Sequence, residues 1–435
     1  MISKAENNRE NAVPKGVTDF LPDQAEQIGF IEERINRTFE LWGFRRIIAP
    51  MLEFEELLAI GMDDSLRAKS FRFEDRQSHR LLAIPPDITP QVARIEAMRM
   101  SGYPLPHRLY YNGRVLRQVE SQSGRSRELY QSGVELIGLD SPEADAEMIA
   151  MTAEILRKLG FGSFKIDLGQ VEFFRGIMAS AGLAQPVVVA LQEAIARKDS
   201  TTVRSILEGE SIPDAIKAEI AALPRMFGST DVIQKASATV KNDRSRRALD
   251  NLAKVVEILA IHGIRNELTV DLGEIRGLSY HTGVTFEGFV PAIGEPVCGG
   301  GRYDGLMGRY GRSVPATGFA FNVLNLLHGV EKSSCMKTPA TPRILLFNMN
   351  DDRRDALELT SRLREKGCIV ARDIIRRDLH DSIEYARRTG IQFVIIVGEP
   401  GVAAEEAVLI RICDGVRRIL TMDEISEIDP SALFS

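Results

Sequence analysis

The sequence RVLRQVESQSGRSRELYQSGVE, residues 114–135, contains two strand-like pieces around a polar turn that is rich in arginine. This pattern predicts a long antiparallel hairpin. Side chains alternate between the two faces of a strand, so we expect Gln131, Gly133 and Glu135 on one face, where Gln131 and Glu135 can address a single ligand. The arginines suit a carboxylate or a phosphate. A solvated basic hairpin is the alternative interpretation.

Segments on both sides of this hairpin extend the pattern. Further short strands are predicted at Leu81–Ile84, Leu109–Leu116, Val134–Ile137, Leu268–Leu272, Thr285–Phe289 and Phe319–Phe321. Apolar residues at helical spacing from Ile28 to Phe39 predict a helix that ends at Gly43. Ser141 and Pro142 predict the start of another helix, because serine caps free backbone donors and proline is tolerated at the first helical position. Without regular βαβ alternation, these elements predict an α+β fold, an antiparallel sheet flanked by helices.

Changes in composition and in hydrophobic pattern along the chain predict its domain organisation. Ala, Leu, Glu and Lys dominate one long stretch, which indicates a helical insertion, and strands alternate with helices near the end, which indicates a small α/β domain. The predicted parts are a polar tail (1–12), a core (13–170 and 263–330), a helical insertion (171–262), a linker (331–342) and a C-terminal α/β domain (343–435).

Composition excludes several classes of protein. The chain has 435 residues, of which 44% are hydrophobic and 27% charged, as in globular proteins of two or three domains. It has no apolar run of about 18–20 residues, so no membrane span is expected, and its polar start lacks the pattern of a signal peptide. Four widely separated cysteines argue against a zinc or disulfide scaffold and favour a reducing cytoplasm. A net charge of −6 gives no reason to expect non-specific nucleic-acid binding.

Two further segments are candidates for ligand binding. Residues 299–306, GGGRYDGL, allow close approach of the main chain to a ligand, and a tight hairpin is the alternative. A phosphate loop is not expected there, because the lysine and hydroxyl of GxxxxGK[ST] are missing. Residues 271–283, DLGEIRGLSYHTG, form a loop that would present Arg276 and Tyr280, unless it is a plain surface loop. None of the six histidines has a recognisable metal or nucleophile partner, so we interpret them as structural.

Taken in order, these segments resemble the histidyl-tRNA synthetase family. The resemblance covers nearly the whole chain from residue 13 and implies a class II fold, with a six- or seven-stranded antiparallel sheet and an anticodon-binding-like module at Ile344–Glu424. The matching segments are PKGVTDFLP (14–22), the first motif (42–53), the second motif (116–135), the histidine-specific loop (275–283), the glycine-rich segment (299–306) and the start of the third motif (318–321). The first motif implies a homodimer as the minimal unit.

The family's ATP-binding motifs are altered in this sequence. The second motif of an active synthetase reads Phe-Arg-x-Glu, and here the glutamate is replaced by Val119. The third motif continues as Gly-x-Glu-Arg, and here Asn322 replaces the glycine and Asn325 the arginine that holds a phosphate. A neutral amide cannot supply the charge of guanidinium, and losing one electrostatic donor costs on the order of 3–4 kcal/mol in other enzymes. We therefore expect no formation of an aminoacyl-adenylate.

The family's amino-acid pocket is better preserved. An acid and a threonine remain at Asp87 and Thr89, whereas Ser279 and His281 depart from the aspartate and second tyrosine of the specific loop. The resemblance implies a histidine site made of Asp87, Thr89, Arg117, Gln131, Glu135, Arg276 and Tyr280. Asp87 and Glu135 would oppose the positive charge of the ligand, while Gln131, Arg276 and Tyr280 would orient it.

A retained histidine pocket beside an altered ATP site resembles the ATP phosphoribosyltransferase regulatory subunit family, a synthetase paralogue. The segments PDITPQVAR (86–94) and VALQEAIARKD (189–199) are similar to that family's versions, although many members have a shorter C-terminal region. This resemblance implies a non-catalytic subunit without cofactor or metal, which partners the short catalytic subunit in histidine biosynthesis and senses histidine.

Two alternatives remain open. One is a divergent histidine–tRNA ligase, and the other is a protein that binds tRNA through its C-terminal domain. The C-terminal arginines, Arg372, Arg376, Arg377, Arg387 and Arg388, are better explained by a solvated surface than by RNA contact.

Overall fold

A computed structural model describes residues 13–118, 126–273, 280–291, 293–333, 342–375 and 377–427. The chain divides into two units, Met1–Lys337 and Thr338–Ser435, and each is described by itself. The predicted tail (1–12), Val119, Arg276 with the rest of residues 274–279, and Arg376 lie outside the described residues.

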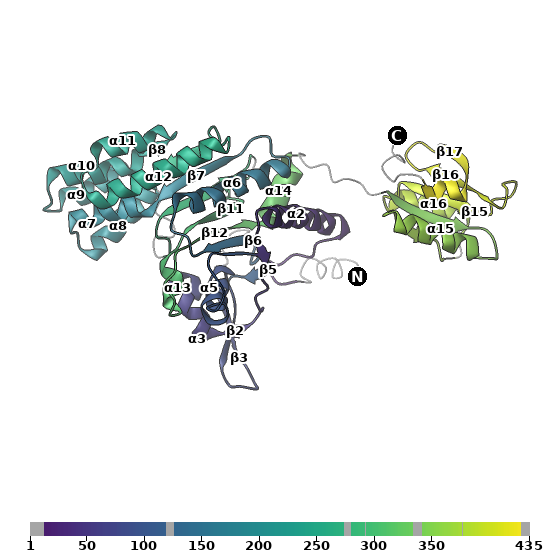
Figure 1. The fold of residues 1–435 in the computed structure, drawn as a ribbon, viewed down its shortest axis with the longest axis horizontal. Helices are drawn as coiled ribbons and strands as arrows, with labels where there is room; N and C mark the ends of the chain where they lie inside the picture. Colours follow the sequence, from purple (N-terminus) through teal and green to yellow (C-terminus); the bar gives the residue numbers. More distant parts are fainter. Residues whose placement is uncertain are drawn as a thin grey trace, which may run out of the picture. The chain divides into compact units, whose positions relative to one another are not determined.

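The described residues of the first unit form a nine-stranded sheet in the order β1-β5-β6-β12-β11-β10-β7-β9-β8 (Figure 1). Its strands are β1 (Arg45–Arg46), β5 (His107–Leu116), β6 (Glu128–Ile137), β7 (Lys165–Gln170), β8 (Phe227–Gly228), β9 (Leu268–Asp271), β10 (Val284–Phe289), β11 (Cys298–Arg302) and β12 (Ala316–Asn322). Neighbours are antiparallel except β1 with β5 and β7 with β9, which are parallel. The predicted α+β fold with a largely antiparallel sheet is confirmed.

Three helices cover one face of this sheet: α2 (Pro22–Leu41), α6 (Pro142–Lys158) and α14 (Val323–Ser333). Their buried side chains join those of Val134, Leu136 and Phe319 in one hydrophobic core. The predicted start of α6 is confirmed, because the Ser141 hydroxyl accepts a hydrogen bond from the Ala144 amide. This core fixes the orientation of β6, so that Gln131, Gly133 and Glu135 face the opposite side of the sheet.

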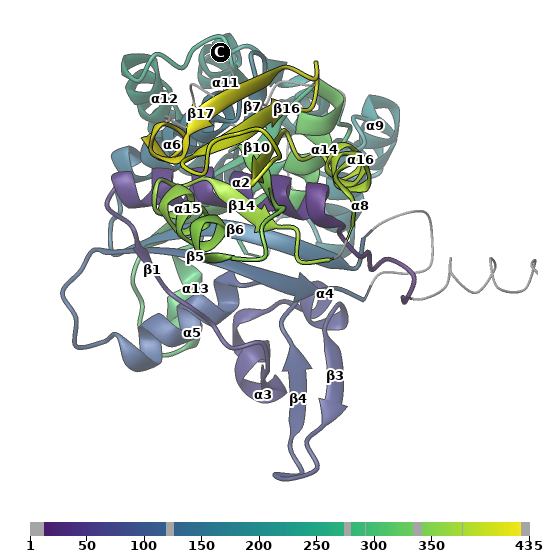
Figure 2. The same ribbon diagram turned by 90° about the vertical axis from the view of Figure 1, so that its right-hand side faces the viewer.

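Smaller elements lie on that opposite side: α3 (Glu55–Leu58), η1 (Ala59–Gly61), α4 (Asp64–Ala68), α5 (Thr89–Arg99), α13 (Gly305–Arg309) and a three-stranded sheet of β2 (Glu53–Phe54), β4 (Leu81–Ile84) and β3 (Phe71–Glu74). Buried residues of α5 and α13 pack against Leu109 and Tyr111 of β5. The β3–β4 hairpin projects from the body of this unit (Figure 2).

The predicted insertion contains α7 (Val171–Ala181), α8 (Gln185–Ala196), α9 (Ser200–Glu208), α10 (Asp214–Ala222), η2 (Leu223–Arg225), α11 (Asp231–Thr239) and α12 (Asp243–Ile261). These helices lie together at one end of the first unit (Figure 1). Strand β8 also falls in this stretch.

The second unit has a five-stranded sheet in the order β14-β13-β15-β16-β17 among its described residues. Its elements are β13 (Arg343–Asn348), α15 (Arg354–Glu365), β14 (Ile369–Arg372), α16 (Leu379–Arg388), β15 (Phe393–Val397), β16 (Glu406–Arg411), β17 (Arg417–Thr421) and α17 (Met422–Glu427). The predicted alternation of strands and helices is present, and the sequence patterns missed only β17 and α17. Gly367 and Gly390 follow the two longer helices with φ of 87° and 69°, as helix-ending glycines do.

Three local details differ from the sequence patterns. Residues 45–49 are strand-like in sequence, but the strand there has only two residues, and the glycine-rich segment, for which a tight hairpin was the alternative, begins as strand β11. A side chain at Gly300 would lie 2.3 Å from the Gly318 carbonyl oxygen, so this glycine is required where β11 and β12 pair. Helix α14 continues to Ser333, so it includes the first three residues of the predicted linker.

Candidate functional site

A cavity of about 410 Å³ lies on the sheet face opposite α2, α6 and α14. Segments from distant parts of the sequence line it, and they come from α4, the start of α5, the β5–β6 hairpin, β11 and β12. Six of the seven predicted site residues line this cavity: Asp87, Thr89, Arg117, Gln131, Glu135 and Tyr280. The seventh, Arg276, lies outside the described residues.

Glu135 lies at the buried end of the cavity, with 1% of its surface exposed. The hydroxyl of Tyr303 donates to Glu135 Oε2, and that of Tyr111 donates to Oε1 over 3.3 Å. Gly318 is the pairing partner of Glu135 on β12, and a Cβ there would lie 2.0 Å from Glu135 Oε2. Burial raises the pKa of Glu135 to about 8, against the lowering effect of the Tyr303 hydrogen bond. A cation placed beside this carboxyl would favour its ionised form.

Asp87 lies nearer the mouth of the cavity and already has charged and polar partners. Arg117 Nη2 donates to Asp87 Oδ2 over 3.0 Å, and Arg117 Nε donates to the Pro86 carbonyl oxygen over 2.8 Å. The amide of Thr89 donates to Asp87 Oδ1 over 3.1 Å, and the Gln131 amide group lies 3.4 Å from Oδ2. The loop before α5 is therefore held against the end of β5 by an ion pair that is about one quarter exposed.

Two aromatic residues that follow the undescribed loop complete the wall. Tyr280 stacks on Tyr303 with ring centroids 5.2 Å apart, and its buried hydroxyl makes no hydrogen bond with any described residue. His281 lies next to it, with Nδ1 3.2 Å from the Arg302 carbonyl oxygen. Burial lowers the pKa of His281 to about 4, so this ring is neutral at physiological pH and donates its Nδ1 proton to that carbonyl.

A buried ion-pair network holds this wall in place. Arg302 is 5% exposed, and its guanidinium contacts Asp145 in the first turn of α6 at 3.0 Å and Asp304 at 3.1 Å. The backbone of Arg302 also accepts the Thr282 amide over 2.7 Å. Breaking a buried pair of this kind typically costs about 3–5 kcal/mol. The network therefore positions His281 and Tyr303 rather than contacting the cavity through its own charges.

Pro296, Phe321 and Asn322 also line the cavity, and Asn322 pairs with Gln131 across β12 and β6. The Asn322 oxygen accepts from the Leu324 amide over 3.2 Å at the start of α14. Asn325 Nδ2 donates to the Pro296 carbonyl oxygen over 2.9 Å. The side-chain amides of Asn322 and Asn325 therefore form hydrogen bonds with backbone groups of the chain itself.

The predicted site omitted four residues that shape the cavity: Tyr111, His281, Tyr303 and Gly318. His281 was interpreted as structural, yet it lines the cavity. Its place at the second tyrosine of the specific loop, directly after Tyr280, was the available indication. Tyr111 and Gly318 reach Glu135 only through the strand register, which the sequence does not give.

The arrangement suits a small zwitterion. Two carboxyl groups, Asp87 and Glu135, can bind a cationic group, Arg117 can bind an anionic group, and the stacked tyrosines accept a flat ring. The unpartnered Tyr280 hydroxyl offers one more hydrogen bond. Among the described residues, no three His, Cys, Asp or Glu side chains come together in a group that could hold a metal ion.

Comparison with known proteins identifies the family of this chain. A sequence model of the family described as histidyl-tRNA synthetase matches residues 16–326. The chain is 59% identical over 93% of both chains to the ATP phosphoribosyltransferase regulatory subunit of Geobacter metallireducens, and 58% identical over 96% of both chains to that of Geobacter sulfurreducens. The chain belongs to this regulatory-subunit family.

Solved structures place the regulatory-subunit family on the synthetase fold. A protein of Bacillus halodurans C, described as an ATP phosphoribosyltransferase regulatory subunit/histidyl-tRNA synthetase, is 27% identical and has a TM-score of 0.77 over 89% of this chain and 98% of its own. The histidyl-tRNA synthetase of Nostoc sp. PCC 7120 has a TM-score of 0.81 at 23% identity, over 96% and 98% of the two chains, and shows the fold alone. Within the described ranges, no helix has the length and apolar character that crossing a bilayer requires.

Proposed function

We propose that this regulatory subunit is non-catalytic, is required for the activity of the short catalytic ATP phosphoribosyltransferase subunit, and confers feedback inhibition by histidine. The observation that carries the proposal is a contrast between two groups of residues that match synthetase motifs. Charged side chains and an unpartnered hydroxyl face the cavity, whereas Asn322 in the cavity wall and Asn325, which is outside the lining, bond to the chain's own backbone.

The side chains in the cavity suggest one orientation for histidine. Its ammonium group would lie between Asp87 and Glu135, and its carboxylate near Arg117. Its ring would lie against the stacked tyrosines, beside the hydroxyl of Tyr280. Coupling to the catalytic subunit would follow from differential affinity, because histidine shifts the assembly towards the state that it binds better.

The test is the variant Asp87→Ala. We expect it to raise the histidine concentration needed to inhibit the complete complex by roughly thirtyfold or more, because removing one partner of a buried or partly buried charge contact costs about 2–5 kcal/mol. Calorimetry on the isolated subunit measures binding directly. Asp250→Ala, at an exposed position on α12, is the matched control. Inhibition at the wild-type histidine concentration by the Asp87 variant would contradict the proposal.

Histidine-dependent ATP–pyrophosphate exchange separates this proposal from a divergent histidine–tRNA ligase. The regulatory function predicts no exchange above background. Exchange by the purified chain would show that the nucleotide end works despite Asn325.

We further propose a homodimer as the minimal unit, in the cytoplasm and without bound tRNA. Exposed apolar side chains of Ile48 and Met51 follow edge strand β1 and support a subunit contact there.

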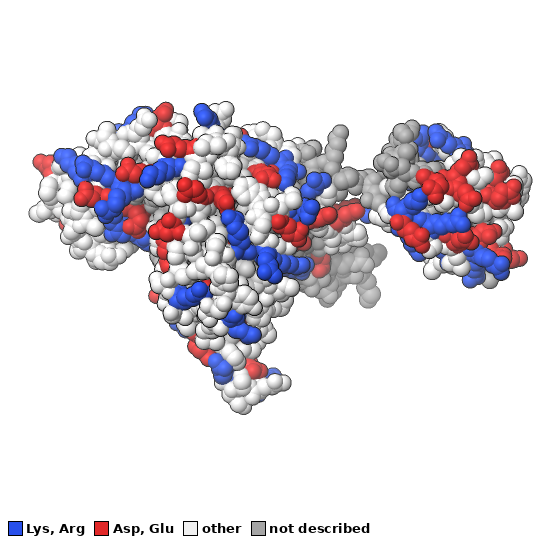
Figure 3. Space-filling view, in the orientation of Figure 1, with Lys and Arg blue, Asp and Glu red and all other residues white. Residues whose placement is uncertain are grey.

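Arginines of the second unit have acidic partners. Arg377 lies 3.7 Å from Asp373, and Arg387 pairs with Glu384. Figure 3 shows acidic and basic side chains interspersed on the visible face of that unit, which does not favour a polyanion. Light scattering of the purified chain measures its oligomeric state. Gel shifts with tRNA at physiological salt test whether it binds tRNA.

A further inference from the structure

Both ends of the projecting β3–β4 hairpin lead into the candidate site. The chain enters the hairpin from α4, where Asp63, Ser65 and Leu66 line the cavity. It leaves β4 at Ile84 and reaches Asp87, which also lines the cavity, three residues later. Figures 1 and 2 show the hairpin extending away from the body between these two points. A change at the cavity can therefore reach the hairpin through either end.

Two consecutive residues at the end of β5 hold both ends of the hairpin. The Gln118 amide donates to the Lys69 carbonyl oxygen over 2.7 Å, before β3. Arg117 Nε donates to the Pro86 carbonyl oxygen over 2.8 Å, after β4. The same guanidinium contacts Asp87 through Nη2. Arg117 thus joins the hairpin to the carboxylate that faces the ligand.

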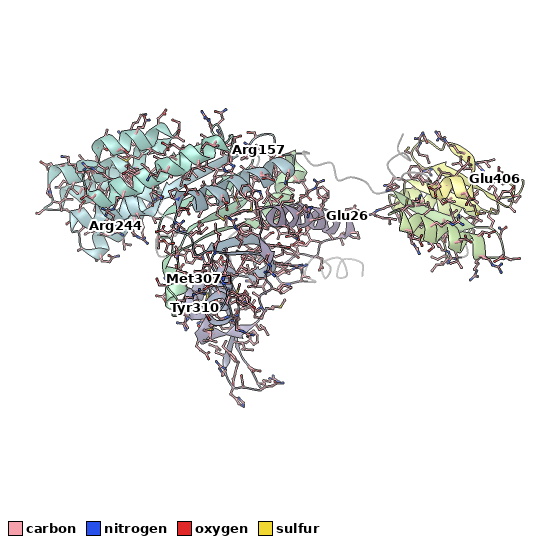
Figure 4. The ribbon with its side chains drawn as sticks, in the orientation of Figure 1. Glu26, Arg157, Arg244, Met307, Tyr310 and Glu406 are labelled. Atoms are coloured by element: carbon pink, nitrogen blue, oxygen red, sulfur yellow. The ribbon has the colours of Figure 1, made fainter. Side chains whose placement is uncertain are left out.

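The hairpin is also anchored away from the cavity. Strand β4 pairs with β2 at Leu82 and Ala83, and Ala83 is buried against Leu58. Glu55 and Glu56 of α3 pair with Arg67 in α4 and with Arg80 in the turn before β4. Helix α3 is itself held from α13, because the Tyr310 hydroxyl donates to the Leu57 carbonyl oxygen over 3.3 Å. Figure 4 shows Tyr310 and Met307 close together at this lower part of the unit. Helix α3 can therefore act as a pivot when the Arg117 contact changes.

We propose that the β3–β4 hairpin is a mobile arm that responds to histidine through Arg117, an inference that rests on the proposed function. A zwitterion at Asp87 brings its ammonium group to the carboxylate and its carboxylate to the guanidinium, so it inserts into the ion pair between Arg117 and Asp87. Moving the guanidinium away from Asp87 also weakens its bond to the Pro86 carbonyl oxygen. Ligand binding then loosens the C-terminal end of the hairpin while it orders the cavity.

Hydrogen–deuterium exchange of the full chain tests this inference. With saturating L-histidine, we expect amides of residues 70–84 to exchange about fivefold faster, the factor that corresponds to about 1 kcal/mol for one hydrogen bond. Amides of β6 should exchange more slowly in the same sample. Unchanged or slower exchange in residues 70–84, while calorimetry shows histidine bound, would overturn the inference and leave the proposed function intact. No binding of histidine would instead overturn the proposed function.

Two arginine variants test the contact without ligand. Arg117→Met keeps the length of the side chain and removes its hydrogen bonds, so exchange in residues 70–84 should already be about fivefold faster in the free protein. Arg114→Met is the matched control, because Arg114 lies three residues earlier on β5 and stacks on Tyr130 with 4.3 Å between its guanidinium carbon and the ring centroid. Equal exchange in the two variants would overturn the inference, and thermal melting shows that each remains folded.

Discussion

The two ends of the cavity differ in what their polar side chains bind. At the amino-acid end, Asp87 and Glu135 face the cavity, and the buried hydroxyl of Tyr280 has no hydrogen-bond partner among the described residues. At the nucleotide end, which is the start of the third motif, Asn322 lines the cavity and accepts a backbone amide of α14, and Asn325 donates to the Pro296 carbonyl from outside the lining. The Tyr280 hydroxyl is open to a ligand, whereas each asparagine has one polar group bonded within the chain.

This difference supports the proposal that the amino-acid half of the site binds a ligand. Leaving a buried hydroxyl unpaired costs about 1–3 kcal/mol, which a ligand can recover on binding. Asparagines that cap a helix and fix a loop contribute to stability without any ligand. Retained ligand binding at one end is therefore compatible with complete loss of nucleotide chemistry at the other.

The largest expected effect comes from filling the space beside Glu135. In Gly318→Ala, the new methyl group would lie 2.0 Å from Glu135 Oε2 and 2.4 Å from the Val134 carbonyl oxygen, so the carboxyl must move. We expect histidine affinity to fall by roughly a hundredfold, as for a displacement of about 1 Å at other sites. Overpacking should also lower the free energy of unfolding by about 1–3 kcal/mol. Calorimetry and denaturant unfolding measure the two effects.

Gly305→Ala is the control for this substitution. A Cβ at Gly305 has no atom within 4 Å, so affinity and stability should both stay close to wild type. Histidine affinity within threefold of wild type in the Gly318 variant would show that Glu135 does not bind the ligand.

A moderate effect is expected from pH. Burial raises the pKa of Glu135 to about 8, so the empty site holds a proton at neutral pH and a cationic ligand must displace it. Histidine affinity should therefore rise between pH 6.5 and 8, by at most about tenfold per unit. The free energy of unfolding should change in the opposite direction. The protonated Glu135 adds to the free energy of unfolding. This addition is fully present below the unfolded pKa of about 4.5 and is lost as pH rises through about 8.

Glu135→Gln separates this carboxyl from other titrating groups. The amide has nearly the same shape and no proton to release, so the rise in affinity between pH 6.5 and 8 should disappear. Isothermal titration in buffers of different ionisation enthalpy counts the proton released by the wild type. A wild-type pH slope that persists in the variant would assign the titration to another group.

The sequence predicted the residues that face the ligand better than the residues that hold them in place. Alternation along β6 was enough to place Gln131 and Glu135 on one face, because the period of a strand is fixed. The bond from Tyr303 to Glu135 joins two residues that are 168 positions apart, and it depends on how β12 brings β11 beside β6. Two elements of the second unit, β17 and α17, were missed because their exposed and charged residues carry little hydrophobic pattern.

The smallest effect is expected from restoring charge at the nucleotide end with Asn325→Arg. The substitution supplies the guanidinium that the synthetase pattern has there, but it removes the hydrogen bond to the Pro296 carbonyl oxygen. We expect the free energy of unfolding to fall by about 1 kcal/mol, as for one lost hydrogen bond, and Asn325→Ala should lose the same amount. ATP affinity and ATP–pyrophosphate exchange should stay at background, because Asn322 still lines the cavity and Val119 cannot replace the missing glutamate. Measurable exchange in the arginine variant but not in the alanine variant would show that one charge was all that the nucleotide end lacked. The two ends would then differ by a single residue instead of by a rebuilt hydrogen-bond network.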